Sequence, residues 1–214
     1  DTALDYYGRS LAIAEELGNK SGMAFTLNNI GALHMRIGDD DTALDYYGRS
    51  LAIFEEIGNV GMEGRMLSNI GNLYMSKGDY DTALDYYNRS LSINEELGNK
   101  RGMGYSLDQI GNVHYNTGDY EHAVEYLEKS LAIHKEIGKK DLELYTLIYL
   151  YLSYQHLGKY YDVKKIHSLI KETKNIEFDL NLRLYELLED KSYLESAYKQ
   201  VEEKANKLEP DVAA

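Results

Sequence analysis

Apolar residues recur at spacings of three and four along most of the chain. In the segment 41–57, Ala43, Tyr47 and Leu51 share one side, whereas Asp45 lies away from it. This spacing is typical of an amphipathic helix with one apolar stripe, and the alternation expected of a half-buried strand is absent. The pattern therefore predicts an all-α protein.

Glycines divide the apolar pattern at intervals of 20 residues. Glycine tolerates the left-handed conformation that ends a helix, and the single proline, Pro210, interrupts nothing upstream. Asp79 and Asp119 follow two of these glycines as helix N-caps. The glycines form two series, Gly18, Gly58, Gly98, Gly138 and Gly38, Gly78, Gly118, Gly158. The helices predicted between them are 2–17, 21–37, 41–57, 61–77, 81–97, 101–117, 121–137, 141–157 and 160–174, followed by 177–189 and 191–208.

The chain is an internal repeat with a period of 40 residues. The stretch DTALDYYGRSLAI at 1–13 recurs unchanged at 41–53, and related forms begin at 81 and 121. One hairpin cannot bury its apolar stripe alone, but stacked hairpins can. We therefore expect a right-handed superhelical solenoid of antiparallel helix hairpins. Its expected parts are a repeat array over 1–174 (half repeat 1–20, hairpins 21–60, 61–100, 101–140 and 141–174) and a divergent helix pair over 175–214 that caps the array or leads into a further domain.

The central copy of the repeat carries a motif that reads Leu67, Ile70, Gly71, Tyr74, Gly78, Tyr80, Ala83, Tyr87, Ser90 and Leu91. These residues resemble the tetratricopeptide repeat. Near-copies stand in register at 27–51 and 107–131, and a more divergent copy stands at 147–163. The usual period is about 34 residues, so a period of 40 is similar to the long repeats of kinesin light chain, spindle-orientation adaptors and bacterial peptide-sensing regulators. The resemblance implies a non-catalytic scaffold that binds a peptide or protein.

Three glycines stand in the middle of predicted helices, where each costs about 1 kcal/mol relative to alanine. A cost repeated at Gly31, Gly71 and Gly111 predicts that the following helix approaches closely at these positions.

The resemblance also implies where a partner binds. In this family the first helix of each hairpin lines the concave face, and in the relatives with long repeats an amide just before the Ile-Gly pair contacts the backbone of the bound peptide. The matching positions are Asn29, Asn69 and Gln109. The alternative is that these amides are ordinary solvated surface or cap neighbouring helices. The expected peptide-binding residues are Asn29, Asn69, Gln109, Asn72, Asn112, Arg65, Arg36 and Tyr105.

A grip on a terminal carboxylate, which a chaperone-binding subclass of the family makes with Lys and Arg, is not expected. The matching positions carry Asn28, Ser68 and Asp108 instead.

Each end of the array has an apolar helix surface that another element would need to cover. The helix 141–157 is apolar on nearly every side, so we expect the C-terminal pair to cover it, with an exposed partner surface as the alternative. The helix 2–17 lacks a preceding partner helix, which leaves Ala3, Tyr7 and Leu11 open. A structural module that self-associates through this end, as a homo-oligomer, is therefore the alternative function. Because the chain begins within a repeat, we expect a fragment of a larger regulatory or signalling protein.

Composition and missing motifs exclude several classes of partner and activity. A formal net charge of −13 argues against nucleic acid and anionic membranes, which need clustered basic residues. The chain has no cysteine and no apolar run long enough to cross a membrane, and we expect a cytoplasmic location.

Neither a nucleotide-binding loop nor a zinc-protease motif is present, so we expect no enzyme activity and no cofactor or metal. Histidines at 34 and 114 occupy the position of Tyr74 and are interpreted as packed polar groups.

Overall fold

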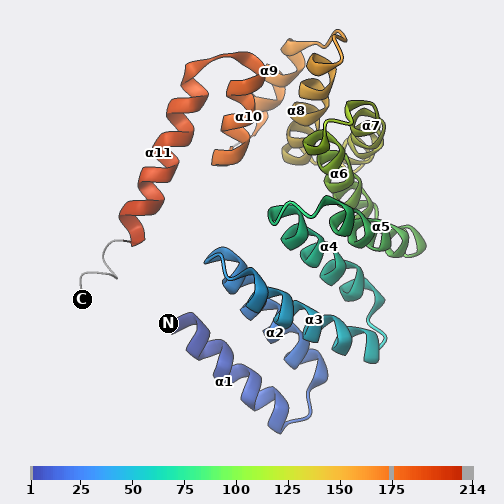
Figure 1. Cartoon of the computed structure of the whole chain (residues 1–214), viewed down its shortest axis with the longest axis vertical. Helices are drawn as coiled ribbons and strands as arrows, with labels where there is room; N and C mark the ends of the chain where they lie inside the picture. Colours follow the sequence, from blue (N-terminus) through green and yellow to red (C-terminus); the bar gives the residue numbers. More distant parts are fainter. Residues whose placement is uncertain (1, 174–175, 209–214) are drawn as a thin grey trace. The chain divides into compact units, whose positions relative to one another are not determined.

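The computed structural model describes residues 2–173 and 176–208, and these residues form eleven α-helices joined by short turns (Figure 1). This architecture confirms the all-α fold, and the helix bounds agree with the sequence-based ones to within three residues. The helices are α1 Thr2–Glu16, α2 Lys20–Arg36, α3 Asp40–Glu56, α4 Val60–Ser76, α5 Tyr80–Glu96, α6 Lys100–Thr117, α7 Tyr120–Glu136, α8 Lys140–His156, α9 Val163–Glu172, α10 Phe178–Leu188 and α11 Lys191–Leu208.

The glycine series ends the helices as the pattern predicts. All eight of these glycines have positive φ, between 61° and 80°. Side chains cap the starts of several helices, as where Asp79 accepts a hydrogen bond from the Thr82 N–H at 3.2 Å, whereas α8 and α10 have no such cap. The end of α10 differs, because Glu189 takes the left-handed conformation there with φ of 56°.

Tertiary contacts divide the chain into two compact units, residues 1–113 and 114–214. In the first unit α1 to α5 pack as consecutive antiparallel neighbours. The boundary falls within α6, inside the repeat array that we expect over 1–174.

The close approach predicted at the mid-helix glycines occurs in the first unit. A Cβ added at Gly71 would lie 2.7 Å from the Tyr87 ring, and one at Gly31 would lie 2.9 Å from the Tyr47 ring. Both rings are buried, at 0% and 3% exposure. Glycine at these positions lets the tyrosine of the following helix lie directly on the helix backbone.

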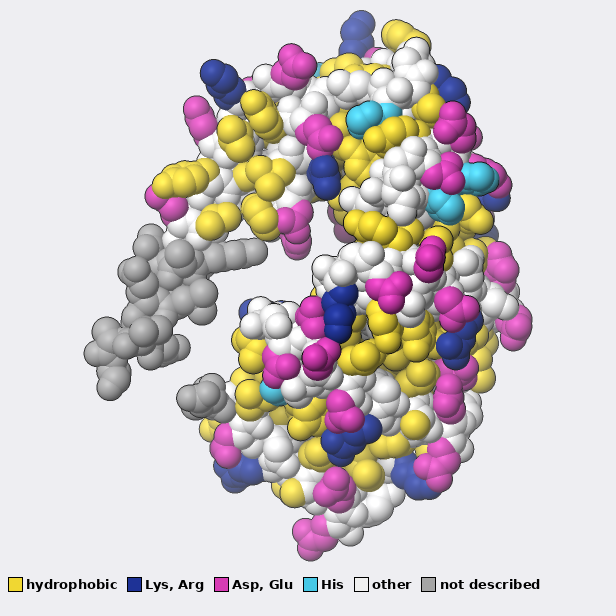
Figure 2. All heavy atoms as spheres, in the orientation of Figure 1, with side chains coloured by type: hydrophobic (Ala, Val, Ile, Leu, Met, Phe, Trp, Pro, Cys, Tyr) yellow, Lys and Arg dark blue, Asp and Glu magenta, His cyan; other side chains and the backbone are white. Residues whose placement is uncertain are grey.

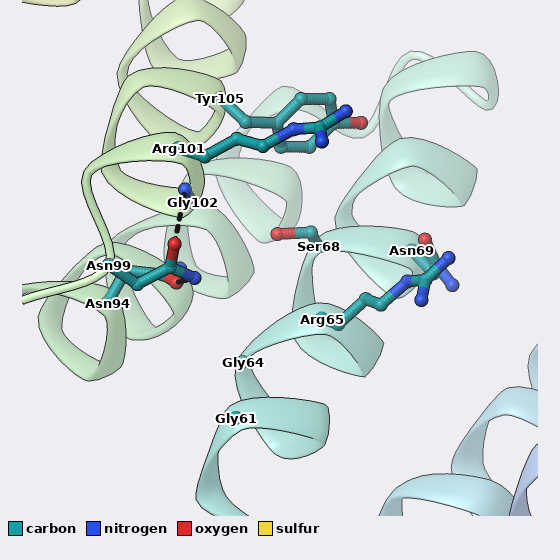
Figure 3. A pocket seen from close by; sticks show the side chains of 10 residues that line it. All are labelled: Gly61, Gly64, Arg65, Ser68, Asn69, Asn94, Asn99, Arg101, Gly102 and Tyr105. Atoms are coloured by element: carbon teal, nitrogen blue, oxygen red, sulfur yellow. Dashed lines mark hydrogen bonds between the residues drawn. The ribbon is translucent and has the colours of Figure 1, made fainter. Parts of the chain in front are cut away.

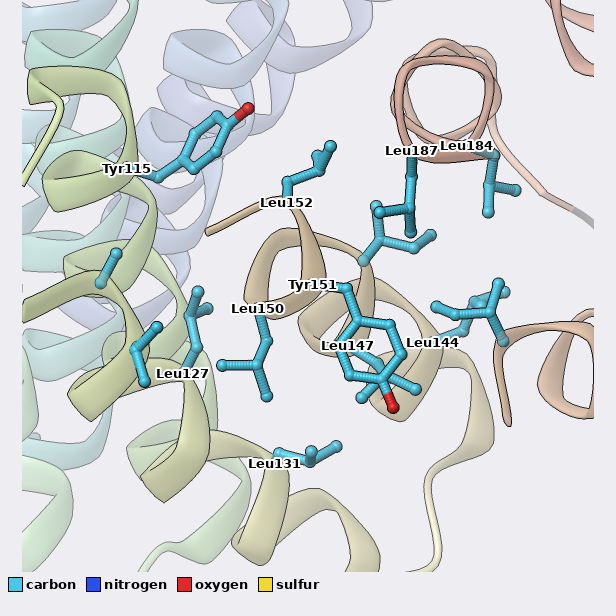
Figure 4. Packing of buried hydrophobic residues seen from close by; sticks show 14 of the residues in the cluster. Tyr115, Leu127, Leu131, Leu144, Leu147, Leu150, Tyr151, Leu152, Leu184 and Leu187 are labelled. Carbon is cyan, nitrogen blue, oxygen red and sulfur yellow. The ribbon is translucent and has the colours of Figure 1, made fainter. Parts of the chain in front are cut away.

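The second unit is built around α8, whose buried side chains point in several directions (Figure 4). Leu127 and Leu131 of α7 pack on one side of α8, and Leu184 and Leu187 of α10 belong to the same core. Tyr115 donates a hydrogen bond to Glu186 of α10 at 3.0 Å. Helix α10 therefore covers part of the apolar surface that α8 presents.

Charged and apolar side chains are distributed unevenly over the surface. Acidic groups are spread over the helices in the face shown in Figure 2, whereas apolar groups gather over α11 and α10. Tyr198, Leu194 and Val201 of α11 are 65%, 41% and 47% exposed. Among the described residues, no helix combines the length and apolar character needed to cross a membrane.

Candidate peptide-binding face

A chain of amides joins α2 to α4 at the predicted positions. Asn69 donates to the Asn28 side-chain oxygen at 2.9 Å, and Asn28 donates to the Asn29 oxygen at 3.3 Å. Asn28 is 8% exposed, whereas Asn69 is half-buried and Asn29 is exposed. The two predicted contacts are therefore linked through a buried asparagine that restricts their orientation.

Asn72 occupies a second junction, between three helices. Its side-chain oxygen accepts a hydrogen bond from the Tyr87 hydroxyl at 2.8 Å, and its amide nitrogen donates to the Tyr105 hydroxyl at 2.9 Å. Burial raises the pKa of Tyr87 well above its usual range, so this hydroxyl stays protonated. Asn72 thereby connects α4 with α5 and α6, and much of its hydrogen-bonding capacity is already used within the protein.

A pocket of about 440 Å³ opens between α4 and the start of α6, above the end of α5 (Figure 3). Arg65 and Asn69 project from α4, and Arg101 and Tyr105 lie across the opening on α6. None of the described residues that line the pocket is a carboxylate, although the chain as a whole carries a net charge of −13. The lining residues are Gly61, Gly64, Arg65, Ser68, Asn69, Asn94, Asn99, Arg101, Gly102 and Tyr105.

The preceding repeat places an aromatic pair at the equivalent positions. Forty residues earlier, Arg65 and Asn94 correspond to Phe25 and Phe54, whose ring centroids lie 5.2 Å apart edge to face. Phe54 is 0% exposed. Replacement of two rings by a guanidinium and a small amide thus converts an apolar contact into a polar pocket.

Asn94 and Gly102 shape the floor of this pocket. Asn94 accepts a hydrogen bond from Asn99 at 2.7 Å and donates to the Ser90 carbonyl at 2.8 Å. A Cβ at residue 102 would lie 1.9 Å from the Asn94 oxygen, so only glycine fits beside this arrangement. Asn99 in turn caps α6 by accepting from the Gly102 N–H at 3.2 Å.

The structure brings three of the predicted site residues together in the pocket, namely Arg65, Asn69 and Tyr105. Other predicted residues lie outside it. Gln109 is half-buried on α6, and Asn112 is only 3% exposed. Arg36 is exposed at the last residue of α2. Asn112 therefore offers almost no accessible surface to a partner.

Asn94, Asn99 and Arg101 were not predicted from the sequence. A signal was available for Asn94, because repeat alignment sets it against Ala14 and Phe54, which are buried apolar residues in the two preceding copies. A polar residue in such a register indicates a local change of chemistry. Arg101 corresponds to Gly61 and had no comparable signal.

These features agree with the family that the sequence matches. The family model described as Tetratricopeptide repeat matches residues 1–56 and 63–136. The chain belongs to the tetratricopeptide repeat family, whose members are protein-binding modules and generally non-catalytic. A search of curated proteins found no match.

Solved structures show the same fold at low sequence identity. BtubC (BKLC) from P. vanneervenii is 20% identical, with a TM-score of 0.68 over 80% of this chain and 70% of that one. A Rap protein complexed with Competence and Sporulation Factor is 19% identical, with a TM-score of 0.66 over 91% of this chain and 51% of that one. A STAND protein with a tetratricopeptide repeat sensor from Pyrococcus horikoshii is 19% identical, with a TM-score of 0.70 over 99% of this chain and 35% of that one. The chain thus spans about half or less of the length of these two regulators.

Proposed function

We propose that this chain is a non-catalytic scaffold that binds an extended segment of a partner protein across α2, α4 and the start of α6. The observation that carries the proposal is the pocket at Arg65 and Arg101, whose described lining residues include two guanidinium groups and no carboxylate. An arginine can bind a carboxylate through two parallel hydrogen bonds, which gives both affinity and geometry. The pocket is therefore suited to an acidic side chain of the partner.

The amides beside the pocket supply the second part of the recognition. An asparagine side chain offers a donor and an acceptor, and so matches a peptide group whatever the side chains of the peptide. Asn29 is exposed and Asn69 is half-buried, and both belong to one hydrogen-bonded chain. We expect the peptide backbone to contact these amides while one acidic side chain enters the pocket.

The fold neighbours support a regulatory setting for such binding. The Rap neighbour is complexed with a factor, and the STAND neighbour carries its repeats as a sensor. By analogy, we propose that this chain is the ligand-sensing part of a larger signalling protein.

The experiment is a peptide-display selection on the immobilised chain and on three variants. Asn69→Ala removes an amide, Arg65→Ala removes one pocket cation, and Arg89→Ala removes an exposed arginine of α5 that does not line the pocket. We expect the wild type and Arg89→Ala to enrich a common acidic motif that the other two variants lose. Enrichment that all variants share equally would contradict the proposal.

A second candidate function is self-association through α1. Three apolar side chains on α1 or just after it are exposed, namely Tyr6 at 67%, Ile13 at 57% and Leu17 at 73%. The equivalent Tyr46 and Ile53 of α3 are half-buried. Light scattering over a range of concentrations distinguishes the two functions. A mass that rises with concentration, together with an empty display selection, would favour self-association.

A further inference from the structure

The turn between α6 and α7 brings two histidines and a carboxylate together. The His122 Nδ1 lies 2.7 Å from the Asp119 Oδ2, and the His114 Nδ1 lies 3.4 Å from the same oxygen. One ligand-type atom from each residue lies within 4.8 Å of the other two. We propose that His114, Asp119 and His122 form a binding site for a divalent transition-metal ion of the zinc class.

The backbone of the turn holds these residues in place. Gly118 ends α6 with φ of 80°, and the Asp119 N–H donates to the His114 carbonyl at 2.9 Å. Asp119 then caps α7 by accepting a hydrogen bond from the His122 N–H at 3.3 Å. The His114 ring is stacked on Tyr126 of α7, with ring centroids 5.5 Å apart. The three side chains are therefore brought together by the helix ends and not by chance contacts between flexible groups.

The ligand set suits zinc better than calcium or magnesium. Imidazole nitrogen and carboxylate oxygen bind Zn²⁺ at about 2.0–2.2 Å, which sets neighbouring ligand atoms of a tetrahedral site roughly 3.3–3.5 Å apart. The His114–Asp119 distance of 3.4 Å already fits this spacing. The His122–Asp119 pair, hydrogen-bonded at 2.7 Å, must open by roughly 0.6–0.8 Å to reach it, and the His122 side chain is 59% exposed and has room to rotate.

The site is open to solvent on one side. The side chains of His114 and Asp119 are 19% and 40% exposed. Three protein ligands with an open side leave at least one coordination position for water or for a group of a partner protein. In either case the ion would tie the end of α6 to the first turn of α7.

The sibling repeats show which residues create the site. The two preceding near-copies keep the capping aspartate, as Asp39 and Asp79. At the positions of His114 and His122, the first near-copy has His34 and Thr42, and the second has Tyr74 and Thr82. Of the three near-copies, only the third has an imidazole at both positions, because it carries His122 as well as His114. The other hairpins therefore provide substitutions that this fold already accommodates.

The test is calorimetric titration of Zn²⁺ into the full chain, with Mg²⁺ as the control ion. We expect one Zn²⁺ site in the wild type and no comparable heat with Mg²⁺. His122→Thr and His114→Tyr install the sibling residues, and each is expected to weaken Zn²⁺ binding by roughly a hundredfold or more, because even groups that only orient a ligand contribute about 10–100-fold. Circular dichroism checks that both variants remain helical.

A gain-of-site variant tests whether the three residues suffice. Thr42→His completes the same set in the first hairpin, where the His34 Nδ1 lies 3.0 Å from the Asp39 Oδ2. We expect the number of bound Zn²⁺ ions to rise from one to two. Absence of Zn²⁺ binding in the wild type, unchanged binding in folded His122→Thr, or a count that stays at one in folded Thr42→His would each overturn the assignment.

Discussion

Gly71 offers a sharp test of how the hairpins pack. A Cβ at this position would lie 2.7, 2.9 and 3.1 Å from three atoms of the Tyr87 ring, which is 0% exposed and cannot move into solvent. Ring displacement would also strain the hydrogen bond from the Tyr87 hydroxyl to Asn72, which is 2.8 Å long. Gly71→Ala should therefore destabilise the protein even though alanine is the better helix former.

The expected change in the free energy of unfolding of Gly71→Ala combines two destabilising contributions and one stabilising contribution. Overpacking of a filled core costs about 1–3 kcal/mol, and loss of a hydrogen bond costs about 1 kcal/mol. Removal of glycine from a helix interior returns about 1 kcal/mol. The sum predicts that Gly71→Ala lowers the free energy of unfolding by about 1–3 kcal/mol.

Gly48 is the matched control. It lies within α3 and is exposed, and apart from its chain neighbours and the backbone of its own helix, no atom of the described residues lies within 4 Å of an added Cβ. Gly48→Ala should raise the free energy of unfolding by about 0.4–1 kcal/mol, because only the gain in helix propensity applies.

Urea unfolding followed by far-ultraviolet circular dichroism compares the two variants with the wild type. The double variant Gly71→Ala with Tyr87→Leu tests the cause, because α7 carries Leu127 at the position of Tyr87. If the clash is with the ring, the alanine should cost less in the Tyr87→Leu background than in the wild type. A Gly71→Ala protein as stable as Gly48→Ala would refute the close-contact reasoning.

Two further predictions concern the helix ends and the second core. Asp79→Ala removes the cap of α5 and should lower the free energy of unfolding by about 0.5–2 kcal/mol, whereas Asp85→Ala on the exposed face of the same helix should change it by less than about 0.5 kcal/mol in a thermal or urea melt. Leu184→Ala removes a fully buried side chain of α10 and should cost about 2–5 kcal/mol, seen as faster hydrogen exchange in α8 and α10. Leu182→Ala, at a position 39% exposed on the same helix, is its control, and equal effects of the two would contradict the packing described for α10.

The regular part of the fold follows from local signals in the sequence. The eight glycines of the two series together follow one another at intervals of 20 residues, and each has the positive φ that ends a helix. Gly31 and Gly71 in helix interiors indicated a close neighbour, and the Tyr47 and Tyr87 rings are that neighbour. These features depend on one residue and its own backbone, which is why a single sequence reveals them.

The candidate site was harder to predict because it depends on side chains from several helices. Asn72 was expected to bind the peptide, but its side-chain amide is hydrogen-bonded to the Tyr87 and Tyr105 hydroxyl groups of α5 and α6. The pocket at Arg65 depends on the small volumes of Asn94 and Gly102, which belong to two different helices. Helical spacing places residues on a face, but it does not show which of them use their hydrogen-bonding groups within the protein.

The central claim is that α2, α4 and the start of α6 bind a peptide segment through amides and an arginine pocket. Its most direct test is the comparison of peptides selected on the wild type with those selected on Arg65→Ala and Arg89→Ala. We expect an acidic motif that persists in Arg89→Ala and disappears in Arg65→Ala. A folded wild-type protein that enriches nothing, or a motif that Arg65→Ala retains in full, would contradict it.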